Sequence, residues 1–155
     1  MERKKNIALV AHDNCKRDLA EWVGWNWKLL LGHQLICTGT TGRLVEETLT
    51  ARTRGSLEGY TIIKLKSGPF GGDQQLGAMI ADGKVDVLIF FWDPMEPQPH
   101  DVDVKALLRI SVLYNIPAAC NRSTADFLIS SQLMEAAYQP IQRDYSEYLG
   151  RKIET

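Results

Sequence analysis

The sequence lacks the features that mark membrane, nucleic-acid-binding and disulfide-stabilised proteins. No apolar run approaches the about 20 residues of a membrane-spanning helix, and the charged start, residues 1–5, precedes too few apolar residues for a secretory signal. Eighteen Lys and Arg offset nineteen Asp and Glu, so the net charge is −1 and no global field attracts nucleic acid or an anionic membrane. Cys15, Cys37 and Cys120 are too few and too far apart for a disulfide framework or a zinc ligand set. We therefore expect a cytoplasmic protein with reduced thiols and with neither a membrane nor a nucleic-acid partner.

What is present is the composition of one ordinary folded domain. The chain has 155 residues, of which 45% are hydrophobic and 24% charged, values that fit a folded chain and exclude a disordered one. Its length fits one domain, and no internal repeat, low-complexity tract or interdomain linker interrupts it. We expect a single domain over residues 1–155.

Five short apolar runs predict the strands of a parallel sheet. They show no polar alternation, which is typical of strands buried on both faces, and they are Asn6–Ala11, Gln34–Thr38, Tyr60–Leu65, Val85–Phe91 and Ile116–Ala119. Each gap between them is long enough for a crossover helix. The pattern predicts an α/β fold, a three-layer α/β/α sandwich with a five-stranded parallel sheet.

Capping residues predict where the helices in these gaps begin. The expected starts are Asp13 or Asn14, Thr41 ahead of Gly42–Arg52, Gly72 or Asp73, Asp101 or Asp103, Ser123 ahead of Thr124–Ile129, and a point within Ile141–Lys152. Gly- and Pro-containing stretches predict irregular loops over Thr53–Gly59 and Asp93–Pro99.

Ligands of an open parallel sheet bind beyond the carboxyl ends of its strands, where four informative loops meet. The loop Thr38–Gly42 has two glycines and three hydroxyls at the start of a helix, which suits a phosphate and is also found in ordinary Gly/Thr turns. The loop Ser67–Asp73 has three glycines and can form an anion nest. Lys16 adds an ammonium group, and together these features favour a phosphate site.

Carboxylates gather at the same edge of the predicted sheet: Asp13, Asp73, Asp93, Asp101 and Asp103. Most aspartates in such loops cap helices, and clustered carboxylates also suit a hard metal ion. His12 and His100 do not form a helical ligand pair, however, and no dense ligand spacing supports a metal, so we expect none.

A phosphate cradle with carboxylates and histidines indicates proton transfer on a phosphorylated small molecule. An aspartate can take a proton from carbon next to a carbonyl, and a histidine can donate to the resulting oxyanion. The residues alone leave elimination and isomerisation open, because both reactions start with the same proton abstraction.

Five segments in order point to one family: Ile7–Asp13 (IALVAHD), Thr38–Gly42 (TGTTG), Ser67–Gln75 (SGPFGGDQQ), Val85–Pro94 (VDVLIFFWDP) and His100–Leu108 (HDVDVKALL). Through them the sequence resembles the methylglyoxal synthase family over essentially its whole length. The resemblance implies a fold of the flavodoxin and Rossmann type. It also implies a carbon–oxygen lyase that converts dihydroxyacetone phosphate into methylglyoxal and inorganic phosphate, without a metal or an organic cofactor.

The resemblance also implies roles for individual residues. Asp73 is expected to remove the substrate proton to form an enediolate, and His100 and Asp103 to transfer protons at the substrate oxygens. The remaining residues are expected around the substrate and its phosphate: His12, Asp13, Lys16, Thr38, Thr40, Thr41, Ser67 and Gly68.

Assembly and regulation follow from the resemblance in the same way. It implies an allosteric homohexamer that inorganic phosphate inhibits, acting in a bypass of glycolysis, with Arg109 as a charge between subunits. Arg151 or Lys152 is expected to help hold phosphate. The segment Thr50–Tyr60 is longer than the family pattern and is expected to lie away from the cleft.

Two other classes of protein are alternatives, and the same residues argue against both. A regulatory domain that senses a phosphate ligand needs no carboxylate base, so Asp73, His100 and Asp103 argue against it. A phosphoacceptor receiver domain needs an aspartate ending its third strand and a lysine after its fifth, whereas this chain has Leu65–Ser67 and Ala119–Asn121 there.

Overall fold

The computed structural model describes residues 1–97 and 99–150 of the chain. At its centre is an all-parallel, five-stranded sheet in the order β3-β2-β1-β4-β5. The strands are β1 Asn6–Ala11, β2 Gln34–Cys37, β3 Ile63–Lys64, β4 Val87–Phe91 and β5 Ala118–Ala119. The predicted sheet is confirmed. The two edge strands are much shorter than the apolar runs that predicted them, because an edge strand has a partner on one side only.

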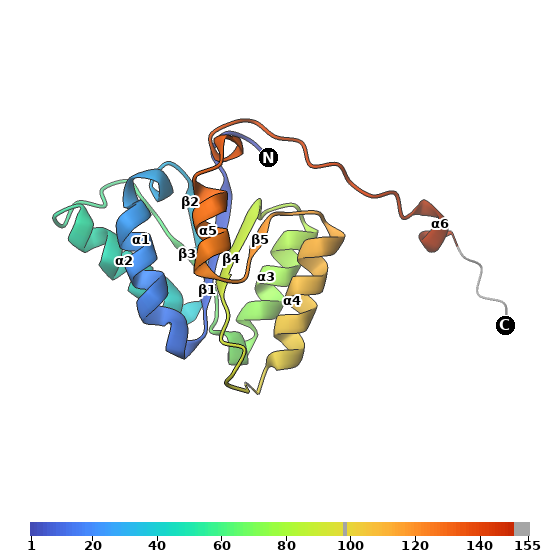
Figure 1. Ribbon diagram of the computed structural model, residues 1–155, viewed down its shortest axis with the longest axis horizontal. Helices are drawn as coiled ribbons and strands as arrows, with labels where there is room; N and C mark the ends of the chain where they lie inside the picture. The colour runs from blue at the N-terminus through green and yellow to red at the C-terminus, as the bar shows by residue number, and fades with distance from the viewer. Residues whose placement is uncertain (98, 151–155) are drawn as a thin grey trace.

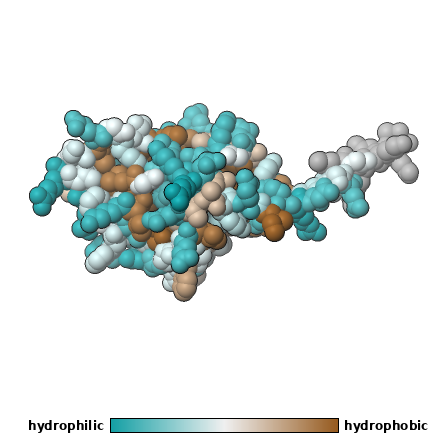
Figure 2. All heavy atoms as spheres, turned by 90° about the horizontal axis from the view of Figure 1, so that it is seen from above, coloured by the Kyte–Doolittle hydropathy of each residue, from teal (hydrophilic) through white to brown (hydrophobic). Residues whose placement is uncertain are grey.

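Helices cover both faces of this sheet and form the three expected layers (Figure 1). One face carries α1 Lys16–Leu30, α2 Gly39–Arg52 and α5 Arg122–Ile129, and the other carries α3 Gly72–Ala81 and α4 Asp101–Leu113. Short 3₁₀ turns are η1 Asp13–Cys15, η2 Gly68–Phe70 and η3 Gln132–Met134. The chain after η3 leaves the layers and runs out to α6 Ser146–Leu149, which projects from the body in Figures 1 and 2. No helix in these described residues is long and apolar enough to cross a membrane.

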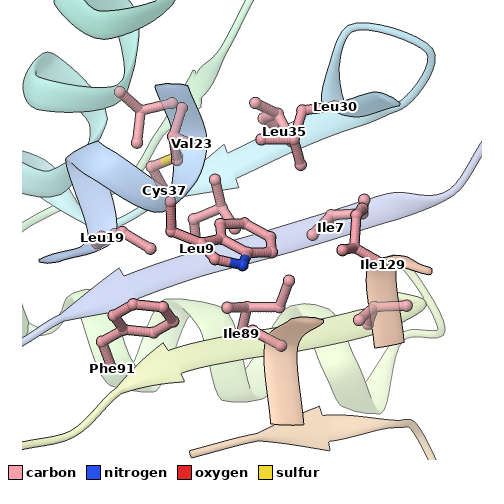
Figure 3. Close-up of a cluster of buried hydrophobic side chains, with 14 of the residues drawn as sticks. Ile7, Leu9, Leu19, Val23, Leu30, Leu35, Cys37, Ile89, Phe91 and Ile129 are labelled. Carbon is pink, nitrogen blue, oxygen red and sulfur yellow. The ribbon is translucent and has the colours of Figure 1, made fainter. Parts of the chain in front are cut away.

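The sheet separates two hydrophobic cores because successive side chains of a strand point to opposite faces. Ile7 and Leu9 of β1 pack with Trp22 of α1 in one core, which Figure 3 shows in close-up. Ala8 and Val10 pack in the other core, under α3 and α4. All of these side chains are buried, which fixes the sheet rigidly under both helical layers.

Two helix starts differ from the sequence prediction near the carboxyl edge of the sheet. The expected start of α2 at Thr41 is wrong: the helix begins at Gly39 after an extended Thr38, which places Thr40 and Thr41 in its first turn. The turn η1 precedes α1, so Cys15 is the N-cap of this helix in place of Asp13 or Asn14. The Asp13 carboxylate pairs instead with Lys16, three residues further on, and the Asn14 amide donates to the remote Asp93.

The start of α5 also differs from the prediction. Asn121 caps this helix, since its Oδ1 accepts a hydrogen bond from the N–H of Thr124 at 2.9 Å, and Ser123 lies within the helix. Both residue types are good caps, and the path of the chain out of β5 decides between them.

The segment after α2 lies at the end of the sheet opposite to the carboxyl edge. Its Tyr60 hydroxyl donates to the carbonyl oxygen of His33 at 2.7 Å, just after the last turn of α1. The long segment Thr50–Tyr60 is therefore remote from the strand ends where ligands of this architecture bind.

Candidate active site

A cavity of about 250 Å³ lies at the carboxyl edge of the sheet, where the loops after β1, β2, β3 and β4 meet. All but one of the residues expected at the site line it: His12, Asp13, Lys16, Thr38, Thr40, Thr41, Ser67, Gly68, Asp73 and His100. Four apolar residues that were not predicted at the site form another part of its wall: Val10, Ala11, Pro69 and Phe90. Three of them could have been predicted, because they lie at the ends of β1 and β4, where ligands of such a sheet bind.

The start of α2 forms one wall of the cavity. The first amides of a helix have no intrahelical carbonyl partner, and the helix dipole adds partial positive charge, so this wall suits an anion. The hydroxyls of Thr38, Thr40 and Thr41 stand at the same end of the helix.

The second loop is held directly against this helix start. The N–H of Gly39 donates to the carbonyl oxygen of Lys66 at 3.1 Å, and a Cβ on Gly39 would lie only 2.8 Å from the backbone nitrogen of Ser67. Glycine is required for this approach, which brings Ser67 and Gly68 to the anion-binding end of α2.

A tight turn then aims the first turn of α3 into the cavity. Gly71 has φ of 94°, a left-handed conformation that favours glycine. A Cβ on Gly72 would lie 2.0 Å from the carbonyl oxygen of Lys66, so no larger residue fits there. The turn places Asp73 in the first turn of α3 with its side chain 3% exposed.

Asp73 is paired with His100, the residue that precedes α4. The Nδ1 atom of His100 lies 2.8 Å from Oδ2 of Asp73, and the imidazole is 11% exposed. Gly68 covers this pair so closely that a Cβ there would lie 2.9 Å from Cε1 of His100 and 3.0 Å from Oδ2 of Asp73. This contact engages Oδ2 of Asp73 and Nδ1 of His100 and does not use Oδ1 or Nε2.

His12 is a buried imidazole that lies next to His100. Its Nδ1 accepts a hydrogen bond from the N–H of Asp93 at 3.3 Å, which places the ring proton on Nε2. Nε2 is buried and has no hydrogen-bond partner among the residues the structure describes. The ring stands edge-on to that of His100, with 5.8 Å between centroids. A buried donor without a partner at the wall of a cavity is suited to a ligand oxygen.

Lys16 and Asp13 form an ion pair at the mouth of the cavity. The hydrogen bond and the charge of the Lys16 ammonium lower the pKa of the Asp13 carboxyl below its usual range. Lys16 is the first residue of α1 and three quarters of its side chain is covered, which directs its charge along the wall of the cavity.

Asp103 is the one expected site residue that does not line this cavity. It lies in the first turn of α4 and borders a second cavity between α3 and α4. Asp73 borders both cavities and is the link between them. Arg109 also borders the second cavity. Arg151 and Lys152 lie outside the described residues.

No group of three or more His, Cys, Asp or Glu side chains within residues 1–97 and 99–150 is arranged to hold a metal ion. The arrangement instead combines an anion-binding helix start, a carboxylate hydrogen-bonded to an imidazole, and a second imidazole with a free donor. This combination defines an open α/β protein with a site for proton transfer on a small anion. A family model described as the MGS-like domain matches residues 28–120.

Similarity to known proteins identifies the family within this class. The chain is 59% identical to a methylglyoxal synthase of Maridesulfovibrio salexigens, over 99% of this chain and 100% of that protein. It is 51% identical to one from Coxiella burnetii, over 96% and 98% of the two chains. The crystal structure of methylglyoxal synthase from Elizabethkingia anophelis superposes with a TM-score of 0.88 at 51% identity, covering 99% of this chain and 95% of that one. The chain belongs to the methylglyoxal synthase family.

Proposed function

We propose that this protein converts dihydroxyacetone phosphate into methylglyoxal and inorganic phosphate, the reaction of a carbon–oxygen lyase. The observation that carries the proposal is the presence, in one cavity, of the Asp73–His100 pair and the anion-binding start of α2. A triose phosphate has a phosphate group for the start of α2 and an acidic C–H bond beside a carbonyl for the Asp73–His100 pair.

The phosphate group of the substrate is held at the start of α2. The amides of Thr40 and Thr41 and the threonine hydroxyls donate to its oxygens, Ser67 and Gly68 close the other side, and the Lys16 ammonium offsets its charge. This grip fixes the hydroxymethyl carbon of the substrate next to Asp73.

Asp73 acts as the base. Its free Oδ1 takes a proton from the hydroxymethyl carbon, and the electron pair of the C–H bond moves into the neighbouring carbonyl to form an enediolate. The enediolate then collapses: the proton of its terminal O–H moves to the neighbouring oxyanion as the terminal oxygen forms a new C=O bond, the C=C electron pair shifts to the bond with the phosphate-bearing carbon, and the C–O bond to phosphate breaks with its electron pair on the departing phosphate. The enol that remains gains a proton at its terminal carbon and gives methylglyoxal.

Two imidazoles stabilise the developing charge. His100 and His12 both line the cavity, and the hydrogen bonds of their rings to Asp73 and Asp93 engage Nδ1 and not Nε2, so both serve the oxygens of the enediolate as donors or proton carriers through Nε2. For Asp103 we propose a role through Asp73, the residue that borders both cavities, because Asp103 has no place on the wall of the substrate cavity.

Elimination rather than isomerisation depends on one torsion angle of the bound substrate. The C–O bond to phosphate has to stand perpendicular to the plane of the enediolate, so that its electrons align with the π system. We propose that the grip of α2 on the phosphate holds this angle, and membership of the family supports elimination.

Incubation of the purified protein with dihydroxyacetone phosphate tests the proposal. Free phosphate and the dicarbonyl product are expected in equal amounts. Glyceraldehyde phosphate in their place would show an isomerase, and unchanged substrate with measurable phosphate binding would show a sensor domain.

We further propose a cytoplasmic homohexamer that inorganic phosphate inhibits allosterically, working in a bypass of glycolysis. Free phosphate has the chemistry of the group that the start of α2 suits, and all three cysteines are unpaired, as in proteins of reducing compartments. Arg109 is exposed on α4 and suits a contact between subunits. Sedimentation equilibrium, and substrate saturation curves with and without phosphate, test these expectations.

A further inference from the structure

Asn14 joins two segments that contribute to the site. Its Nδ2 donates to Oδ2 of Asp93 at 2.9 Å and to Oε2 of Glu96 at 2.5 Å. Asn14 lies in η1, directly before α1, whereas Asp93 and Glu96 lie in the loop after β4. One amide group therefore fastens this loop, which leads on to His100, to the segment that carries His12.

The loop after β4 has few other attachments. The N–H of Met95 donates to Oδ1 of Asp93 at 2.9 Å, which is a bond within the loop itself. In the described part of the chain, the hydrogen bonds that reach residues 93–97 from outside come from Asn14 and from His12. The amide of Asn14, together with this Met95 bond, also holds the pKa of the Asp93 carboxyl below its usual range, so the acceptor stays ionised.

The backbone of Asp93 contacts His12, one of the two imidazoles that we propose to act on the substrate. Its backbone N–H is the donor that Nδ1 of His12 accepts, and this bond keeps the ring proton on Nε2. If the loop shifted and the bond opened, Nδ1 could take the proton, and Nε2 would change from a donor into an acceptor. Such a ring could not donate to an oxyanion.

Resting on the function proposed above, we propose that Asn14 is a positioning residue for the reaction. By clamping Asp93 and Glu96, it holds the Asp93 N–H on Nδ1 of His12 and thereby keeps Nε2 as a hydrogen-bond donor toward the substrate. Asn14 itself does not line the cavity, so it acts through another residue.

The ring of His12 gives a readout that is independent of activity. In protein labelled with ¹⁵N at histidine, the wild type is expected to show His12 with a bare Nδ1 and a protonated Nε2. Asn14→Ala is expected to give a mixture of the two tautomers. An unchanged His12 signal in Asn14→Ala would overturn the proposal, even if the protein turned out to have no synthase activity.

Kinetics give the second test. Asn14→Ala is expected to lower kcat about tenfold with little change in KM, because a donor to the enediolate gains strength as charge develops. Asn14→Gln, which keeps the amide on a longer stem, is expected to recover part of this loss. Asn26→Ala is the control, since it removes a side-chain bond of the same length, 2.9 Å from Nδ2 to the carbonyl oxygen of Trp22, within α1 and away from the cavity lining.

The route through His12 is tested by combining the changes. In a His12→Gln background, Asn14→Ala is expected to cause no further loss of kcat, because the donor that it positions is gone. An equal tenfold loss in both backgrounds would show that Asn14 acts elsewhere, for example on the segment leading to His100, and would refute the proposal.

Discussion

Asp73 and His100 are 27 positions apart in the chain, yet Oδ2 of the first lies 2.8 Å from Nδ1 of the second. Each residue stands at the start of a helix, Asp73 in the first turn of α3 and His100 just before α4, and these two helices pack side by side on one face of the sheet. The pair is therefore held by the starts of two helices, which orient the proposed base and its hydrogen-bond partner before any substrate binds.

The proposed base can be removed without disturbing the phosphate grip. Asp73→Asn is expected to lower kcat by about 10²–10⁴-fold, the contribution of a positioned base, while phosphate still binds. Steady-state turnover and calorimetric titration with phosphate measure the two effects. Asp82→Asn, at the other end of α3, is the control and should leave turnover unchanged. Normal turnover of Asp73→Asn would remove this residue from the mechanism.

Gly68 is expected to be intolerant of even one methyl group. In Gly68→Ala the new Cβ would meet His100 and Asp73 at 2.9 and 3.0 Å, so the pair has to move apart. Overpacking of this kind costs about 1–3 kcal/mol in the free energy of unfolding, and kcat should fall because the base is displaced. Urea unfolding and turnover assays measure both.

The control for this change is Gly77→Ala in the middle of α3. A Cβ at Gly77 meets no atom within 4 Å, so the better helix propensity of alanine should raise stability by up to about 1 kcal/mol. Equal tolerance of alanine at both glycines would contradict the packing argument.

Lys16 is expected to act mainly on substrate affinity. Lys16→Ala removes the ammonium that we propose to bind the phosphate, so we expect a loss of about 1.5–3 kcal/mol in binding, seen as a rise in KM. Lys84→Ala is the control, because Lys84 pairs with Asp82 on the surface. A KM that does not change in Lys16→Ala would place this ammonium outside the binding pocket.

His33 gives stability a dependence on pH that is separate from catalysis. Burial of the ring, and secondarily the nearby charge of Lys5, lowers the pKa of His33, and its Nδ1 accepts a hydrogen bond from the N–H of Lys5. The unfolded chain then binds a proton more readily than the folded one. The stabilisation is complete above about pH 6.5, the ordinary histidine value, and is lost as the pH falls below it toward the lower folded pKa.

Urea unfolding at several pH values between neutral and mildly acidic measures this effect. His33→Gln keeps a polar acceptor and cannot take up the proton, so its stability should decline less over the same range. Parallel pH profiles for the two proteins would show that His33 does not titrate differently on folding.

Local sequence determined most of the fold and the residue types of the site. The apolar runs of β1, β2 and β4 read directly as buried parallel strands, because a strand with helices on both faces has no polar side, whereas both residues of the edge strand β3 are exposed. Glycines, threonines and aspartates placed after those runs had to meet at one edge, since parallel strands all end there.

Only the tertiary structure decided where some of these residues lie and which segments they contact. It set Asp103 beside a second cavity, moved the start of α2 ahead of Thr41, and assigned Asn14 to a distant loop rather than to a helix cap. The physical reason is clearest for Asn14. A side chain that can cap its own helix or contact a remote segment is placed by whichever partner the packed chain brings within hydrogen-bond distance, and that distance is not encoded by neighbours in sequence.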